Sequence, residues 1–494
     1  MWMFYPVPLR FGGIGAAEGC LLCGAYTAQK RRQNKISTNY IFMADVIKLR
    51  KGLDINLKGK ARLDTVSVEP SAEYALVPDD FCGVKPKVVV KEGDYVKAGE
   101  PLFVNKTSPG VKFASPVSGT VKEVLRGDRR KVLAVKVLAE KEMHYVDFGV
   151  KDVDKLTGEE VVEALLEAGL FGYINQLPYA VSTTPDTQPK AIFVSALRDM
   201  PLAGDFEYEL KGQEADFQAG LTALSKVASV HLGIGRQQED LVKGRSAFCN
   251  VKVHVFDGPC PAGNVGVQVN HICPVNKGEV VWTVEPTAVL FFGRLFNSGR
   301  VDLRRRVALA GPEVIDPVYA ELTVGQQLTT LLAGRLAHTE HVRIINGNPL
   351  TGRPCCTEGY LGAHVSEVTV IPEGDNVDEL FGWIMPRFRQ FSMSRSYFSW
   401  LFGRKREYTL DARVKGGERH IIMSGEYDKV LPMDIYGEYL IKAIITGDID
   451  KMEQLGIYEV APEDFALAEF VDSSKLELQR IVREGLDMLR KENA

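Results

Sequence analysis

The amino-acid sequence predicts an α+β protein of several domains, in which a small β-rich domain precedes an α/β domain and the chain ends in helices. Three observations support this prediction. Short β-rich runs, separated by Gly, Pro and Asp turns, fill residues 64–137. Apolar strands alternate with amphipathic helices over residues 155–235. After residue 460, apolar residues recur at helical spacing.

The composition is that of a soluble globular protein with room for several domains. The 494 residues are 45% hydrophobic and carry a net charge of −4. Residues 1–42 hold five basic side chains and one acidic, a balance of +4, which leaves −8 on the remainder. This acidic body argues against nucleic acid as the main partner. No stretch reaches the roughly 18 apolar residues of a membrane span, so we expect any association with a membrane to be peripheral.

Residues 1–42 form a leader without helical or strand period, and patterned sequence starts at Met43. We expect a disordered tail or a mis-assigned start, with a targeting role as the alternative. The eight cysteines are too scattered for a disulfide scaffold, which favours a reducing, cytoplasmic compartment. They also give no pair of spacings suited to zinc or iron–sulfur, and we predict no metal site.

Residues 43–145 are predicted to form a barrel-sandwich hybrid of the biotinyl/lipoyl type. The strings "GDYVKAGEPLFV" (93–104) and "ASPVSGTV" (114–121) resemble the two halves of such a domain. A carrier holds its prosthetic group on a lysine at a hairpin tip, and that position falls on Ser108, with Lys106 two residues away. We therefore expect the scaffold of a carrier without its function.

Residues 146–335 are predicted to form a Rossmann-like α/β domain. "GEEVVEALLEAGL" (158–170) is an amphipathic helix closed by Gly169, and "AIFVSAL" (191–197) is a buried strand. "VWTVE" (281–285), "AVLFFG" (288–293) and "RRVALAG" (305–311) are taken as further strands. Gly233 and Gly235 in "HLGIGRQ" offer a weak phosphate-loop signal, and we favour an ordinary turn there.

Residues 336–410 are predicted to form a β-grasp (SLBB-like) domain, and residues 411–494 a largely helical C-terminal domain. The aromatic and basic side chains of 381–408 have the composition of a protein interface or an anionic membrane surface. A core helix and loop flanked by charges is the competing interpretation. The candidate interface residues are Trp383, Arg387, Phe388, Arg389, Phe398 and Trp400.

Histidines and carboxylates give no catalytic constellation, and no catalytic residue is predicted. His338 and His341 stand three apart, a spacing that two metal ligands on one helix face would have. We favour a solvated face for this pair.

Several long strings, in order, resemble one family: "IKLRKGLDINLKG", "NKTSPGVKFASPVSGTVKEVLRGDRRKVLAVKV", "TQPKAIFVSALRDMPLAG", "HVFDGPCPAGNVGVQV", "RIINGNPLTG" and "ELFGWIMP". From about Met43 to the C-terminus the chain is similar to the NqrA family, one of the subunits of the Na+-translocating NADH:quinone reductase. One departure is Cys260, which stands where the family usually has His, so we assign that position no proton transfer.

The resemblance implies no cofactor in this subunit. Flavin-bearing relatives in complex I and Rnf-type complexes carry the loop G-L-R-G-R-G-G-A-G-F-P, where this chain reads "GLFGYINQLPY". Gly169, Gly172 and Pro178 persist, but residues 173–177 add side chains where backbone would meet phosphate. The cysteines of the relatives' iron–sulfur domain are also missing, because no cysteine follows Cys356. FMN, FAD, riboflavin and the iron–sulfur centre are expected in partner subunits.

By resemblance, the chain is a peripheral subunit on the cytoplasmic face of a six-subunit pump that passes electrons from NADH to a ubiquinone-type quinone and exports Na+. Its main partners would be the membrane-embedded flavin subunits, and the isolated chain would catalyse nothing. A quinone slot is predicted at Phe81, Val84, Pro178 and Tyr179, with core or interface packing as the alternative. Two other functions stay open: an NADH-oxidising flavoprotein, and a non-enzymatic adaptor.

Overall fold

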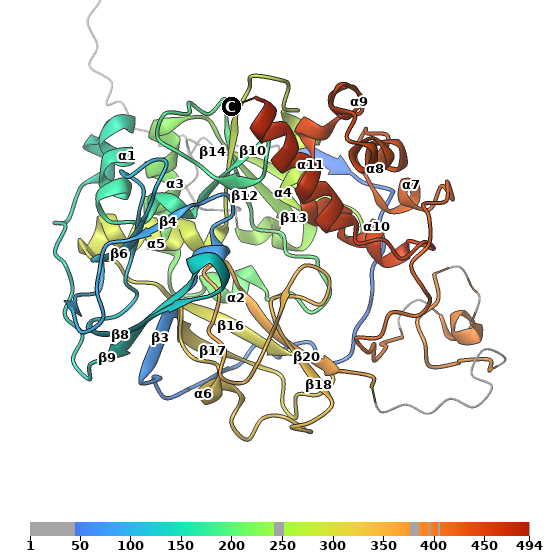
Figure 1. Ribbon diagram of the computed structural model, residues 1–494, viewed down its shortest axis with the longest axis horizontal. Helices are drawn as coiled ribbons and strands as arrows, with labels where there is room; N and C mark the ends of the chain where they lie inside the picture. The colour runs from blue at the N-terminus through green and yellow to red at the C-terminus, as the bar shows by residue number, and fades with distance from the viewer. Residues whose placement is uncertain are drawn as a thin grey trace, which may run out of the picture. The chain divides into compact units, whose positions relative to one another are not determined.

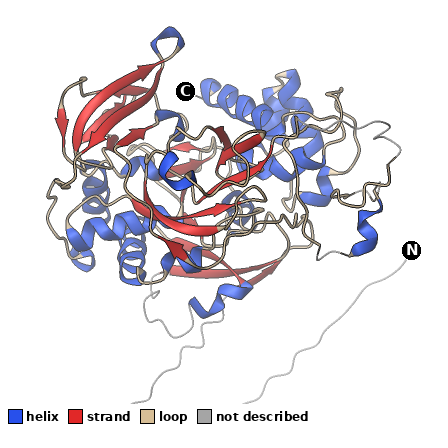
Figure 2. Ribbon diagram, turned by 90° about the horizontal axis from the view of Figure 1, so that it is seen from below, coloured by secondary structure: helices blue, strands red, loops and turns tan. Residues whose placement is uncertain are grey.

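The computed structural model describes residues 45–241, 251–375, 385–393, 395, 397–403 and 406–493, and the predicted leader at 1–42 lies outside them. This part of the chain contains four sheets and a group of C-terminal helices (Figure 1). Figure 2 shows the helices that lead to the C-terminus gathered beside the strands of the sheets. None of the described helices combines the length and the hydrophobicity that a membrane span needs.

The predicted β-rich domain consists of two small antiparallel sheets that share one hydrophobic core. Its strands lie within the β-rich domain predicted by the sequence. Alternation along β9 places Val135 and Val137 in the core. Ser108 lies in the turn between β6 and β7, where its carbonyl accepts from the Val111 N–H at 2.9 Å. One sheet is β3 (Glu73–Leu76), β9 (Val132–Ala139), β8 (Gly119–Arg126) and β5 (Tyr95–Val96); the other is β4 (Pro86–Val88), β6 (Pro101–Asn105) and β7 (Lys112–Ala114).

The α/β part is built on a seven-stranded sheet in the order β1-β14-β13-β12-β15-β10-β11. Its first five strands run parallel, and β10 joins β15 antiparallel. The chain passes from β12 to β13 and β14 on one side, and then returns to place β15 on the other side of β12. The strands are β1 (Asp45–Lys48), β10 (Ile174–Leu177), β11 (Val181–Ser182), β12 (Ile192–Ser195), β13 (Val230–Gly235), β14 (Val251–Asp257) and β15 (Val281–Val284).

Helices cover both faces of this sheet, as parallel strands buried on both faces require. α1 (Gly158–Glu167), α3 (Glu214–Val227) and α5 (Pro286–Ser298) pack together on one face, and α4 (Val265–Ile272) lies with the C-terminal helices (Figure 1). α2 is short (Phe206–Leu210). α1 starts with a capping box formed by Thr157 and Glu160 and stops at Gly169, which has a φ of +70°. The predicted helix and its stop are confirmed.

The predicted strand "AVLFFG" was wrong, because residues 288–293 belong to helix α5. Pro286 occupies the first turn, and Gly299 ends the helix with a φ of +69°. The apolar run is buried on all sides and has no polar face. Such a run carries no period, so only its flanking Pro and Gly mark it as a helix.

The third part is a six-stranded sheet in the order β19-β18-β20-β16-β17-β2. It draws strands from both sides of the predicted boundary at 335/336, and β2 comes from the N-terminal region. One small helix, α6 (Thr329–Leu332), packs into its core. The strands are β2 (Thr65–Val66), β16 (Arg304–Ala310), β17 (Val318–Thr323), β18 (Val342–Asn346), β19 (Arg353–Cys355) and β20 (Glu367–Pro372).

The C-terminal residues form the predicted helical region, whose core is shared with apolar side chains of residues 49–57 and with residues of the α/β part such as Phe256 and Val267. Its last helix, α11 (Leu478–Glu492), turns Ile481, Val482, Leu486 and Leu489 inward, as the sequence predicted. Before it come α7 (Tyr427–Val430), α8 (Gly437–Thr446), α9 (Ile449–Gln454) and α10 (Ala466–Val471). The 3-10 turns of the described chain include η1 (Pro78–Asp80), η7 (Phe398–Phe402) and η9 (Pro462–Phe465).

Candidate functional site

A cavity of about 490 Å³ opens where β12 and β15 end. Ser195 closes β12, and Thr283 and Val284 close β15, so the cavity meets the carboxyl edge of the parallel sheet. These two strands are the point at which the strand order reverses, and α/β sheets hold their ligands in the crevice beyond such a point. Helices α4 and α5 also begin at the cavity wall.

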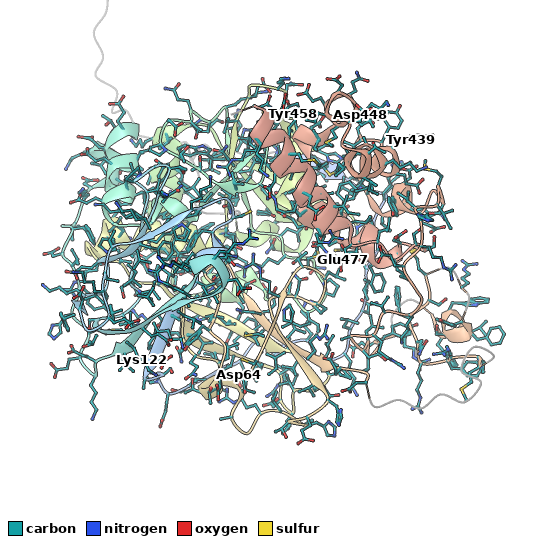
Figure 3. The ribbon with its side chains drawn as sticks, in the orientation of Figure 1. Asp64, Lys122, Tyr439, Asp448, Tyr458 and Glu477 are labelled. Atoms are coloured by element: carbon teal, nitrogen blue, oxygen red, sulfur yellow. The ribbon has the colours of Figure 1, made fainter. Side chains whose placement is uncertain are left out.

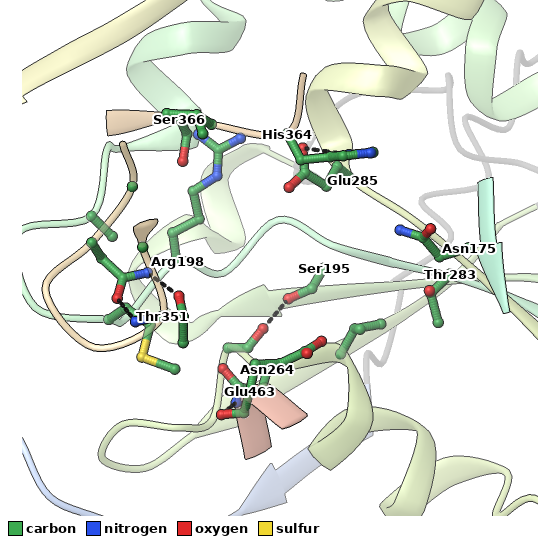
Figure 4. Close-up of a pocket in the computed structure, with 18 of the residues that line it drawn as sticks. Asn175, Ser195, Arg198, Asn264, Thr283, Glu285, Thr351, His364, Ser366 and Glu463 are labelled. Carbon is green, nitrogen blue, oxygen red and sulfur yellow. Dashed lines mark hydrogen bonds and ion pairs between the residues drawn. The ribbon is translucent and has the colours of Figure 1, made fainter. Parts of the chain in front are cut away.

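Segments far apart in the sequence complete the wall. The barrel contributes Asp80 and Cys82, and the helical region contributes Glu463. The six-stranded sheet contributes Asn346 to Asn348 and Arg353, and the loop before β20 adds His364 to Ser366. In Figure 4, Arg198, Ser366, His364 and Glu285 face the cavity from one side, and Asn264 and Glu463 lie opposite them.

A hydrogen-bonded network behind the cavity wall holds Arg198, which lines the cavity. Arg198 donates to Glu209 at 2.7 Å and to the Thr287 hydroxyl at 2.8 Å. Thr287 in turn donates to Glu209 at 2.9 Å, and Arg305 donates to Thr287 at 3.2 Å. Arg198 is therefore held in one orientation by a buried carboxylate, which positions its charge rather than leaving it mobile.

Two carboxyl groups at the wall have raised pKa values. Burial raises the pKa of Asp199 to about 6, although its Oδ2 accepts from the Gly263 N–H at 2.9 Å. Its Oδ1 makes no hydrogen bond to the described residues. Burial also raises the pKa of Glu463, and the pKa of neighbouring Asp464 rises to about 8 through burial and the nearby Glu463 charge. A carboxyl group like Asp199 exchanges its proton close to neutral pH.

A histidine and a glutamate face each other at the β15 side of the cavity. Burial alone would raise the pKa of Glu285, but His364 and the arginines Arg305 and Arg198 hold it below its usual value. His364 Nδ1 stands 3.8 Å from Glu285, beyond hydrogen-bond range, and neither ring nitrogen has a hydrogen-bond partner among the described residues. His364 thus lines the cavity while both of its ring nitrogens are buried without a hydrogen-bond partner.

The predicted quinone slot comes from two segments, the first (79–86) with Phe81 and Val84 and the second (176–181) with Pro178 and Tyr179. The structure brings them together beside this cavity. Ser182 N–H, just after the second segment, donates to the Cys82 carbonyl of the first at 2.9 Å. Phe81 itself lies in the core with its ring 5.4 Å from that of His364 and 5.2 Å from that of Tyr173. Of the predicted slot, Phe81 and Pro178 are buried, and Val84 and Tyr179 are half-buried. Their neighbours Asp80, Cys82, Leu177 and Ala180 line the cavity instead.

The predicted flavin-loop frame is filled by packing. A Cβ on Gly172 would lie 2.3 Å from the Phe113 ring, and one on Gly169 would lie 2.9 Å from the Ala114 nitrogen. These two glycines thus permit close contact with β7 of the barrel. Tyr173 and Ile174 are buried within the same core.

The other residues considered in the sequence, His338, His341 and Cys260, do not form a common site. His338 pairs with Glu313 at 2.7 Å and His341 with Asp375 at 3.0 Å, so the two rings have different partners. Across the described residues, no group of three His, Cys, Asp or Glu side chains is placed to hold a metal. Cys260 is buried with its thiol 3.7 Å from the Met200 sulfur, and burial next to Asp199 raises its pKa.

The predicted interface residues lie outside the cavity. Phe388, Arg389, Phe398 and Trp400 are exposed, Arg387 is half-buried, and Trp383 is outside the described residues.

Sequence reasoning missed Ser195, Arg198 and Asp199, although a signal was present. These polar residues follow directly on the apolar strand "AIFVSAL", and the ends of parallel strands carry ligand contacts. The contributions of Asn264, His364 and Glu463 had no such signal, because loops from other regions bring them to the site.

Comparison with known proteins covers the three strand-containing regions. Residues 47–140 match the NqrA N-terminal barrel-sandwich hybrid domain, residues 156–301 the NqrA second alpha/beta domain, and residues 306–357 the NQRA C-terminal domain. The third match spans the predicted boundary at 335/336, as the six-stranded sheet does.

Whole-chain relatives agree with these domain matches. The NqrA subunit of the Na(+)-translocating NADH-quinone reductase of Yersinia pestis bv. Antiqua is 34% identical over 451 residues, which is 90% of this chain and 100% of the relative. The corresponding Neisseria meningitidis serogroup B protein is 33% identical over 452 residues, with the same coverage. A solved NAD+-reducing [NiFe]-hydrogenase in the air-oxidized state aligns with 44% of this chain and 50% of its own, at 14% identity; its TM-score of 0.29 carries no conclusion. On the domain matches and these relatives, the chain belongs to the NqrA family.

Proposed function

We propose that this chain is the NqrA subunit of a Na+-translocating NADH:quinone oxidoreductase and sits peripherally on the cytoplasmic face of the membrane. The observation that carries the proposal is sequence identity of 33–34% to NqrA subunits of that complex over their whole length. The chain would supply no catalysis alone, and the membrane-embedded flavin subunits would be its main partners.

The electron carriers are proposed to reside in those partners, as FMN, FAD, riboflavin and an iron–sulfur centre. Two features support this. Gly169 and Gly172 are used for contact with the barrel, and no cysteine follows Cys356 in the sequence. A flavin phosphate is held by several convergent backbone N–H groups, and most iron–sulfur clusters are held by four Cys thiolates.

Quinone is the proposed ligand of the cavity where it adjoins Phe81 and Pro178. Cys82, Leu177 and Ala180 offer an apolar edge there, and rotation of the His364 ring, whose nitrogens are buried without a partner, would present a hydrogen bond to a carbonyl oxygen. Small-molecule sites combine these two kinds of contact. Asp199, with a pKa of about 6, is a proton source of suitable acidity for a quinone that takes up protons on reduction.

We propose finer names for two regions. The reversal of strand order at β12 and β15 supports a Rossmann-like assignment for the α/β part. The sheet of β16 to β20 with the single helix α6 supports a β-grasp (SLBB-like) assignment.

Membership of the pump is tested by purification. A tagged chain expressed with its partners should be recovered with integral-membrane flavoproteins. The chain expressed alone should show no flavin absorbance band at about 450 nm. Recovery without membrane partners would favour the adaptor alternative. A stoichiometric flavin band in the isolated chain would favour the NADH-oxidising flavoprotein.

The quinone site is tested separately by calorimetric titration with a short-chain ubiquinone. Cys82→Phe fills the apolar edge of the cavity and should weaken binding by at least about tenfold. Cys356→Phe, at an exposed cysteine outside the cavity, is the matched control and should bind like the wild type. Equal binding by both variants would place the quinone elsewhere and leave the membership of the pump intact.

A further inference from the structure

Around η7 the chain presents its large apolar side chains outward and its small polar one inward. Phe398, Trp400, Leu401 and Phe402 are between 44% and 60% exposed, whereas Ser399 is fully buried. This reverses the usual partition of a short helix, in which apolar residues face the core. Phe388 from the preceding loop is 44% exposed, and its ring centroid lies 6.0 Å from those of Phe398 and Phe402.

Positive charge accompanies these rings without any acidic residue. From residue 385 to residue 406 the sequence contains no Asp or Glu. Arg395 lies over the Trp400 ring at 5.4 Å and Arg406 over the Phe402 ring at 4.7 Å. Arg389 is exposed beside them in the sequence. The segment is thus basic on a chain whose net charge is −4.

The exposed rings are held against the body of the protein by an inward-facing anchor. Phe391 is half-buried, and its ring lies 5.5 Å from Tyr408 and 5.8 Å from Phe470 of α10. Tyr408 is buried, and its backbone bonds to the N-terminal residues Asn56 and Lys58. The outward rings therefore have a fixed base, which lowers the entropic cost of any contact they make.

We propose that Phe388, Trp400, Leu401, Phe402, Arg389 and Arg395, named here the aromatic–arginine patch, bind the surface of an anionic bilayer. Aromatic and aliphatic side chains next to arginines are the composition of an interfacial membrane anchor. Arginines attract anionic headgroups, while Trp and Phe enter the boundary with the acyl chains. Protein interfaces also combine aromatics with arginine, so the observation that favours a bilayer is the charge of a single sign from residue 385 to residue 406, which suits a uniformly anionic surface. The proposal goes beyond docking through partner subunits, because the chain itself would touch lipid.

The test is vesicle co-sedimentation of the purified full chain without partner subunits. Phosphatidylcholine vesicles with about one third phosphatidylglycerol should bind it, and pure phosphatidylcholine vesicles should bind it at least about fivefold more weakly. Trp400→Ser with Phe402→Ser should reduce binding to the anionic vesicles by at least about tenfold. Arg389→Gln should reduce it about fivefold at low salt, and added salt should remove most of that difference.

The control is Tyr436→Ser with Tyr439→Ser, two equally exposed aromatics on and before helix α8, where Figure 3 labels Tyr439. This variant should bind vesicles like the wild type, and unchanged circular dichroism and melting would show that both variants fold. Vesicle binding that is equal for all variants, or that ignores lipid charge, would overturn the proposal. The proposal would also be overturned if the wild type did not bind vesicles and the Trp400→Ser, Phe402→Ser variant failed to join the membrane complex. The patch would then be a protein interface. Loss of partner recovery by all chains, with vesicle binding intact, would count against membership of the pump alone.

Discussion

At the scale of single residues, the most unusual pair outside the cavity is His231 and His254 on adjacent strands. His231 Nδ1 and His254 Nε2 are 3.0 Å apart, and the rings are parallel within 4°. His231 also stacks on Phe193 at 4.8 Å. Burial, followed by the second imidazole, lowers the pKa of His231 to about 4, and burial lowers that of His254 as well. Both rings are thus neutral in the folded protein at physiological pH.

This pair should make the protein less stable in mild acid. The folded pKa lies below the unfolded value of about 6.5, so the unfolded chain takes up the proton first as pH falls, and stability is lost between about pH 6.5 and 4. We expect His231 to account for about 1–2 kcal/mol of the fall in unfolding free energy between pH 7 and pH 5. His231→Phe keeps the stacked ring, and urea titrations at the two pH values should show a smaller fall. His144→Gln, at an exposed histidine, should keep the wild-type fall, and an equal fall in His231→Phe would argue against the pair.

At the scale of elements, we expect the apolar face of helix α11 to contribute much more to the free energy of unfolding than its polar face. Leu486 is fully buried in the C-terminal core, and Glu484 on the opposite face is exposed and pairs with Arg480. Leu486→Ala should lower the unfolding free energy by about 2–5 kcal/mol, since it leaves a cavity. Glu484→Ala should change it by less than about 0.5 kcal/mol. Urea unfolding of the two variants decides the point, and a mild effect of Leu486→Ala would mean that α11 is loosely docked.

The elements also show where prediction from sequence succeeds. Helices α1 and α11 were predicted because their polar faces give a clear period and α1 has a cap and a Gly stop. The strand predicted at 288–293 was wrong because burial on every side removes that period, and only Pro286 and Gly299 marked a helix. Local sequence therefore predicts half-buried elements better than fully buried ones.

At the scale of the whole molecule, Arg483 of α11 links three regions. It donates to the Cys82 sulfur at 3.2 Å, to the Ala180 carbonyl at 3.0 Å and to the Tyr179 carbonyl. These contacts hold the barrel, the edge of the seven-stranded sheet and the helical region together next to the cavity. Only the residues that follow β12 carried a local signal for the cavity, because the rest of its wall comes from all these regions and no short string contains it.

Removal of this arginine should loosen the cavity rim. Arg483→Met leaves the carbonyls of Tyr179 and Ala180 without their donor, at a cost of about 1–3 kcal/mol. Hydrogen exchange of residues 176–182 should accelerate. Arg480→Met, one turn earlier and engaged only with exposed Glu477 and Glu484 in the described contacts, should leave that exchange unchanged. Equal protection in both variants would show that the rim is held by other contacts.

The partners of the two N-terminal strands, β1 and β2, constrain the order in which the chain can fold during synthesis. Asp45 of β1 pairs with His254 of β14, and Thr65 of β2 pairs with Tyr319 of β17, both in parallel. On the ribosome the barrel strands can pair as soon as they emerge, because their partners are close in sequence. The strands in front of the barrel must wait, unpaired and open to other chains, until residues far downstream have been made. The last stages of folding therefore return to the first part of the described chain.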